Sequence, residues 1–84
     1  MSFTDWKVYV HSNVDAVEDV YGVYELSNSK QYPDKVIYIG RGRLRDELKR
    51  YLNEPCTSGA LYFRYEKTLS DLKARERELA LLKE

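Results

Sequence analysis

Two tyrosines and two glycines stand in mirrored triplets of this 84-residue sequence. The first triplet is Gly22-Val23-Tyr24 and the second is Tyr38-Ile39-Gly40. Successive side chains of a strand point to opposite faces, so each triplet places its tyrosine and its glycine on one face. If the two triplets lie on neighbouring strands, two phenol groups can point at one spot. Glycines at these positions let a strand or a phosphate group approach without meeting a Cβ.

A cluster of basic side chains begins directly after the second triplet. Residues 41–50 hold five basic residues against two acidic ones, the basic ones being Arg41, Arg43, Arg45, Lys49 and Arg50. Residues 1–35 hold three lysines against six acidic residues, a net charge of −3, so the rest of this neutral chain carries +3. A local basic patch favours an anionic partner such as a nucleic acid backbone. The alternative is a solvated helix face, since a neutral domain lacks the strong electrostatic footprint of a dedicated binder.

The elements that must position these groups begin with a predicted hairpin. Residues 20–26 and 36–40 are rich in Val, Ile and Tyr, which predicts two strands, and the polar connection between them predicts an antiparallel pair. Residues 6–12 alternate weakly and are interpreted as a strand or an extended arm.

The second half of the chain predicts two helices around a third strand. Apolar residues recur at i, i+4, i+7 and i+8 over 43–53, which predicts a one-sided helix that contains Leu44, Leu48, Tyr51 and Leu52. Residues 60–67 alternate between apolar and polar and predict a strand with one wetted face. Good helix formers without Gly or Pro predict a helix over 69–83.

Together these elements predict an α+β fold, a small three-stranded antiparallel sheet flanked by helices in the order β-β-α-β-α. We expect a single domain over 1–84, with residues 1–16 as an N-terminal strand or arm. A single cysteine excludes an internal disulfide, and the sequence lacks an apolar run of membrane-spanning length. We therefore expect a cytoplasmic protein.

With these residues in view, the sequence resembles the GIY-YIG nuclease domain family, which is named for two triplets of this kind. The match covers about residues 17–84. The last predicted helix is also similar to the family pattern, in which an alanine is followed four residues later by a glutamate and then by an aliphatic pair. This pattern aligns with Ala74, Glu78 and Leu81-Leu82. The order of strands and helices also agrees with the family.

The resemblance implies metal-assisted hydrolysis of phosphodiester bonds in DNA, with DNA favoured over RNA. It implies catalytic roles for Tyr24, Tyr38, a helix arginine and Glu78, with Glu78 holding one Mg²⁺ or Mn²⁺ ion. A tyrosine is a poor base at its ordinary pKa of about 10, so it must lie near a metal or another cation. Helical periodicity does not separate Glu76 from Glu78, and the register of the family alone prefers Glu78.

The sequence departs from the family on the predicted helix 43–53. Alignment of the apolar positions places Glu47 where the family has its arginine. Arg43 and Arg50 lie on the same flank, so either can replace that arginine or pair with Glu47, and Arg43 is favoured because it lies nearer Gly40. Arg41 and Arg45 are less well placed. The sequence also ends before the family's late asparagine.

Three hypotheses of function follow. The first is a metal-dependent endonuclease with a relocated arginine, and the second is a GIY-YIG-like domain that binds nucleic acid without cutting it. The third is a protein-interaction module, which an exposed apolar patch would support. The oligomeric state is left open.

Overall fold

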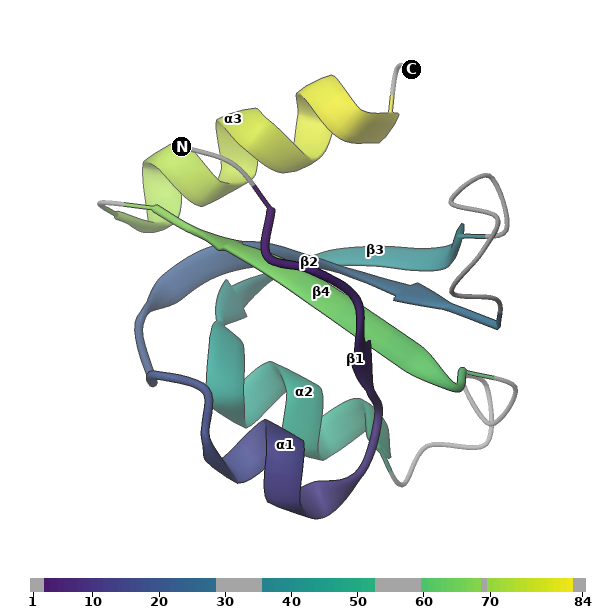
Figure 1. Ribbon diagram of the computed structural model, residues 1–84. Helices are drawn as coiled ribbons and strands as arrows, with labels where there is room; N and C mark the ends of the chain where they lie inside the picture. Colours follow the sequence, from purple (N-terminus) through teal and green to yellow (C-terminus); the bar gives the residue numbers. More distant parts are fainter. Residues whose placement is uncertain (1–2, 29–35, 53–59, 69, 83–84) are drawn as a thin grey trace.

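The computed structural model describes residues 3–28, 36–52, 60–68 and 70–82. Within these residues the chain forms an α+β domain with a four-stranded antiparallel sheet and three helices (Figure 1). The strands are β1 (Lys7–Val8), β2 (Tyr21–Ser27), β3 (Val36–Arg43) and β4 (Tyr62–Lys67), and the helices are α1 (His11–Asp15), α2 (Leu44–Leu52) and α3 (Asp71–Leu82). None of the helices in the described residues is long and apolar enough to span a membrane.

The predicted strands and helices appear as β2, β3, β4, α2 and α3, with bounds shifted by up to three residues. The expected ends of the helices at residues 53, 69 and 83 lie outside the described residues. The prediction of three strands is wrong, because β1 adds a fourth that pairs with β4. The range 6–12, interpreted as a strand or an extended arm, forms a strand only at Lys7–Val8, and its last two residues begin the helix α1.

The helix α1 was not predicted. Its five residues, HSNVD, are poor helix formers, and its N-terminus carries no side-chain cap. Val14 is fully buried and belongs to the same core cluster as Leu44 and Leu48 of α2. Tertiary packing therefore stabilises this helix, where the local sequence does not.

The sheet has the order β1-β4-β2-β3, so β2 is a central strand and β3 lies at an edge. Figure 1 shows α1 and α2 on one face of the sheet and α3 on the other. Residues 22–27 of β2 are all buried, as expected for a strand covered on both faces.

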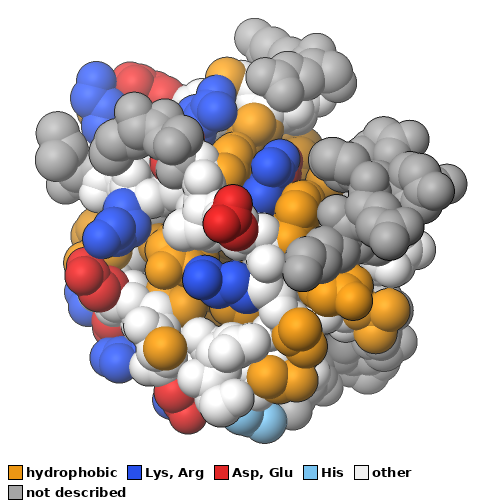
Figure 2. All heavy atoms as spheres, viewed as in Figure 1, with side chains coloured by type: hydrophobic (Ala, Val, Ile, Leu, Met, Phe, Trp, Pro, Cys, Tyr) orange, Lys and Arg blue, Asp and Glu red, His pale blue; other side chains and the backbone are white. Residues whose placement is uncertain are grey.

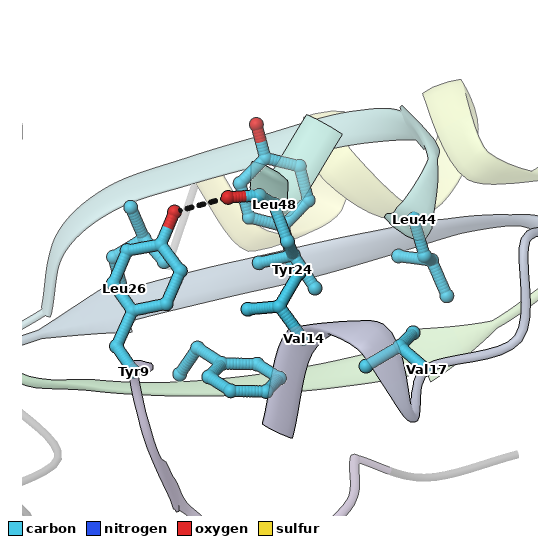
Figure 3. Packing of buried hydrophobic residues seen from close by; sticks show 8 residues of the cluster. Tyr9, Val14, Val17, Tyr24, Leu26, Leu44 and Leu48 are labelled. Atoms are coloured by element: carbon cyan, nitrogen blue, oxygen red, sulfur yellow. Dashed lines mark hydrogen bonds between the residues drawn. The ribbon is translucent and has the colours of Figure 1, made fainter. Parts of the chain in front are cut away.

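Two hydrophobic clusters lie on opposite faces of the sheet. On the α2 face, Tyr24 and Leu26 pack with Leu44 and Leu48 (Figure 3). On the α3 face, Val23 packs with Ala74 and Leu81. Neighbouring residues of β2 thus belong to different layers, and a side chain that reaches one helix layer cannot reach the other.

Removing the Leu48 side chain tests the core between α2 and the sheet. Leu48 is fully buried, and its carbonyl oxygen accepts a hydrogen bond of 2.7 Å from the Tyr9 hydroxyl. We expect Leu48→Ala to lower the free energy of unfolding by about 2–5 kcal/mol, because it leaves a cavity beneath the sheet. Urea denaturation measures the change. The control Leu72→Ala, at a leucine of α3 that is 64% exposed, should change it by less than about 0.5 kcal/mol. Equal effects would contradict this description of the core.

Candidate functional site

The two tyrosines of the triplets lie on the same face of the sheet. In the antiparallel register Tyr24 is opposite Gly40, and Tyr38 is opposite Leu26. Residues paired in this way point to one face, here the face covered by α2. The ring centroids of Tyr24 and Tyr38 are 6.0 Å apart. The hairpin therefore brings both phenol rings together.

Gly40 makes room for the Tyr24 ring. A Cβ built on Gly40 would lie 2.5 Å from Tyr24 Cζ, closer than real side chains approach. A Cβ on Gly22 would likewise lie 2.8 Å from Leu44 Cδ1, at the start of α2. The glycines thus serve packing between the strands and α2 in this structure.

Tyr51, from the last turn of α2, joins the tyrosine pair. The Tyr38 hydroxyl donates a hydrogen bond of 3.1 Å to the Tyr51 hydroxyl, and the two ring centroids are 4.9 Å apart. The ring centroid of Tyr51 lies 6.4 Å from that of Tyr24. We call Tyr24, Tyr38 and Tyr51 the tyrosine cluster. The sequence showed Tyr51 only as an apolar position of a helix, although its place one turn after Leu48 already put it on the buried face.

Glu47 borders the tyrosine cluster. The Tyr24 hydroxyl donates a hydrogen bond of 3.2 Å to Glu47 Oε1. Gly42, opposite Gly22 in the register, has a φ of 135° and lies beside Glu47, whose Cγ would be 3.0 Å from a Cβ at that position. A residue other than glycine there would meet both backbone strain and the glutamate.

The surroundings keep the phenols protonated. Burial raises the pKa of Tyr24 well above its usual value, and the negative charge of Glu47 raises it further. Burial, together with the hydrogen bond to Tyr51, raises the pKa of Tyr38 to about 12. At neutral pH both groups are hydrogen-bond donors and not bases.

Glu78 is placed away from the tyrosine cluster. Its Oε1 lies 3.3 Å from Arg41 Nε, and the same guanidinium donates a hydrogen bond of 2.9 Å to Asp71. Arg41 is opposite Val23 in the register, and Val23 faces α3. Glu78 thus approaches the sheet from the α3 face, whereas Tyr24 lies on the α2 face.

Glu76, the alternative that helical periodicity allowed, does not take the place of Glu78. Its carboxylate forms an ion pair of 3.7 Å with Lys73 one turn earlier, and its side chain is 58% exposed against 21% for Glu78. The structure therefore turns Glu78 toward the sheet and Glu76 toward solvent.

The Glu78 carboxylate, which the resemblance expects to hold a Mg²⁺ or Mn²⁺ ion, pairs with Arg41 in this structure, and the ion stays a prediction. A magnesium ion takes oxygen ligands in octahedral geometry and is usually bound through one or two carboxylates together with waters and substrate phosphates. Here the carboxylates of Asp71 and Glu78 both contact Arg41, so a guanidinium occupies the position between them. The described residues also contain no group of three or more His, Cys, Asp or Glu side chains that could hold a metal ion.

Acidic side chains pair with most of the basic residues of the segment 41–50. Arg43 pairs with Asp19 at 2.9 Å, Lys49 with Asp15 at 3.1 Å, and Arg50 approaches Glu47 at 3.9 Å. The hydrogen bond from Arg43 holds the pKa of Asp19 below its usual range, and the charge of Arg45 adds to this effect. The acidic first part of the chain therefore folds against the basic segment.

This pairing limits the electrostatic field of the molecule. On the face drawn in Figure 2, acidic and basic side chains are interspersed and do not gather by sign. The side chains of Arg43, Lys49 and Arg50 are nevertheless 51%, 51% and 65% exposed. Exposed ion pairs contribute only about 0.2–1 kcal/mol, so a phosphate group can replace the carboxylate of such a pair.

The raised pKa of Tyr24 predicts a loss of stability in alkali. A group whose pKa is higher in the folded than in the unfolded state stabilises the fold below its unfolded pKa of about 10, and this contribution decreases as the pH rises further. Tyr24→Phe should lower the free energy of unfolding at neutral pH by about 1.5 kcal/mol, through loss of a hydrogen bond to a charged group. Above about pH 10 the difference between the two proteins should shrink. Urea denaturation at neutral pH and above about pH 10 measures this difference in stability between the wild type and Tyr24→Phe. A difference that grows in alkali would contradict the raised pKa of the buried phenol.

The comparisons with known proteins add one relationship. No curated protein and no solved structure matches the chain. A sequence-family model described as a domain of unknown function, DUF7508, matches residues 2–84. The match covers almost the entire sequence, and the chain therefore belongs to the DUF7508 family.

Proposed function

We propose that this protein is a GIY-YIG-like domain that binds nucleic acid without cutting it. The observation that carries the proposal is the hydrogen bond from Tyr24 to Glu47. The resemblance expects an arginine at position 47, where a positive charge would stabilise the anionic transition state of phosphodiester hydrolysis. A carboxylate holds that position here, beside a phenol that stays protonated.

A glutamate in place of the arginine is expected to slow phosphodiester hydrolysis strongly. Loss of one donor that stabilises a developing negative charge typically raises the barrier by about 2.7–4 kcal/mol, which lowers the rate by about 10²–10³-fold. A negative charge in its place adds repulsion toward the phosphate. The placement of Glu78 on the α3 face, in contact with Arg41, also supports binding without cleavage.

The exposed basic side chains support the binding part of the proposal. Arg43 lies at the end of β3, and Lys49 and Arg50 lie in the last turns of α2, each with about half or more of its side chain exposed. Lys49 pairs with the exposed carboxylate of Asp15, whereas Arg43 and Arg50 pair with the half-buried carboxylates of Asp19 and Glu47. A phosphate group can compete with these carboxylates because the cations themselves are exposed. Binding through such residues is weak, lacks sequence preference and depends on salt.

The salt dependence of binding tests the basic segment. If about three phosphates are neutralised, a plot of log affinity against log salt for duplex DNA should have a slope near −2.7, measured by fluorescence anisotropy of a labelled duplex. The triple variant Arg43→Ala, Lys49→Ala, Arg50→Ala should bring the slope close to zero. The control variant Lys7→Ala, Lys67→Ala, Arg75→Ala loses the same charge at three exposed positions outside the segment. It should retain most of the slope of the wild type. Absence of binding by the wild type at low salt would refute the proposed function.

A plasmid assay tests the absence of cleavage. We expect supercoiled plasmid incubated with the wild type and Mg²⁺ or Mn²⁺ to be nicked no faster than plasmid incubated with Glu78→Ala, because Glu47 opposes the phosphate charge. Metal-dependent nicking that Glu78→Ala abolishes would contradict the proposal and favour an endonuclease. In the same assay Glu47→Arg tests the reason: a gain of about 10²-fold would identify Glu47 as the group that blocks catalysis.

A further inference from the structure

A cleft lies between the end of β4 and α3, away from the tyrosine cluster. Its volume is about 310 Å³, and its lining residues are Glu66, Thr68, Lys73, Glu76, Arg77 and Ala80. Glu66 is opposite Val23 in the register, and Val23 packs against α3. The cleft therefore lies on the α3 face of the sheet, whereas Tyr24 lies on the other face.

Glu66 provides an unused hydrogen-bond acceptor at this cleft. The residue is only 4% exposed, and its Oε2 accepts a hydrogen bond of 3.1 Å from Arg77 Nε. Its Oε1 is buried and has no hydrogen-bond partner among the described residues. A buried acceptor without a donor costs about 1–3 kcal/mol, and most such atoms in folded proteins are satisfied. A ligand with an N–H donor would satisfy it.

The charges around the cleft are already balanced. Glu66 pairs with Arg77 at 3.1 Å, and Glu76 pairs with Lys73 at 3.7 Å, so two carboxylates face two cations. A charged ligand would leave one charge uncompensated beside the buried Glu66 carboxylate, which is unfavourable. A neutral donor such as an amino group on an aromatic ring would not.

Size and shape favour a planar ligand. A volume of about 310 Å³ is at the lower end of the range of small-molecule sites, roughly 300–1,000 Å³. Ala80 and the aliphatic stems of Lys73 and Arg77 supply apolar lining. The Arg77 guanidinium is a planar group that stacks on aromatic rings, and it already lies 5.8 Å from the centroid of the Phe3 ring.

We infer that this cleft binds a nucleobase with an exocyclic amino group, namely adenine, cytosine or guanine, and that the amino group donates to Glu66 Oε1. Arg77 stacks on the base, and the Lys73–Glu76 ion pair lies at the mouth of the cleft. The base is supplied either by a free nucleoside or by a single-stranded nucleic acid, because both present the same amino group. The cleft is a second binding site, separate from the basic segment 41–50.

Two nucleosides that differ by one group test the inference. Wild-type protein labelled with ¹⁵N is titrated with adenosine and, separately, with purine riboside, which lacks the exocyclic amino group. We expect shifts centred on the amides of Lys73, Arg77 and Ala80, and a dissociation constant for adenosine about tenfold lower than for purine riboside. Titration with a short oligodeoxyadenylate distinguishes the sources: tighter binding per site identifies a nucleic acid strand, and equal binding identifies the free nucleoside.

A matched pair of variants tests the role of Glu66. Glu66→Gln presents an amide in place of the free oxygen and should remove the preference for adenosine. Glu18→Gln, at a glutamate that pairs with Lys67 outside the cleft, should leave it unchanged. Equal affinities of the wild type for adenosine and purine riboside would overturn the inference, as would the absence of shifts at the cleft up to the solubility of adenosine, which would mean that water alone satisfies Glu66. The comparison of nucleosides uses the wild type, so it decides the matter even if Glu66→Gln does not fold.

The nucleoside experiment is independent of the proposed function. Loss of salt-dependent DNA binding would refute the role of the segment 41–50, but the adenosine result would stand. Conversely, failure of adenosine to bind would leave the basic segment untouched.

Discussion

The contact between the Tyr24 ring and the backbone of Gly40 is the constraint on which the tyrosine face depends. Because Gly40 lacks a Cβ, the ring of Tyr24 lies against the neighbouring strand where any other residue would exclude it. This position puts the Tyr24 hydroxyl within hydrogen-bond distance of Glu47 on α2 and its ring near Tyr38 and Tyr51. An aromatic ring packed across a glycine also supports the register of the hairpin. The glycine and the tyrosine of the two triplets are therefore parts of one packing arrangement.

The burial of β2 on both faces separates the candidate site residues into two groups, one on each side of the sheet. Tyr24 and Val23 are neighbours in the chain, yet one packs against α2 and the other against α3. Glu78 and Arg41 lie on the Val23 side. A fold of this kind can bring two groups together from opposite faces only beyond an edge of the sheet. Neighbouring residues of a central strand therefore contact different helices, although they are adjacent in the sequence.

The sequence was sufficient to predict the main elements, because their patterns are long and regular. Leu44 and Leu48 are buried as the helical periodicity indicates, and the triplets pair in one hairpin. It was insufficient for α1, whose residues disfavour a helix and which is stabilised by burial of Val14. Nor could it show that Asp15 and Asp19 would neutralise Lys49 and Arg43, because these pairs join segments more than twenty residues apart. The surroundings of Glu78 likewise depend on where α3 packs, which helical periodicity does not decide.

The position of β3 at the edge of the sheet has a consequence for solubility. An eight-residue edge strand offers backbone groups to which another chain could add a strand, and this is a common start of aggregation. Arg41 and Arg43 lie on this strand, so a second copy aligned antiparallel would bring positive charges close together across the new pair. Gly42 between them has a φ of 135°, outside the range of a regular strand, which makes the edge a poorer template. The same arginines that are candidates for contact with nucleic acid thus also oppose growth of the sheet into fibres.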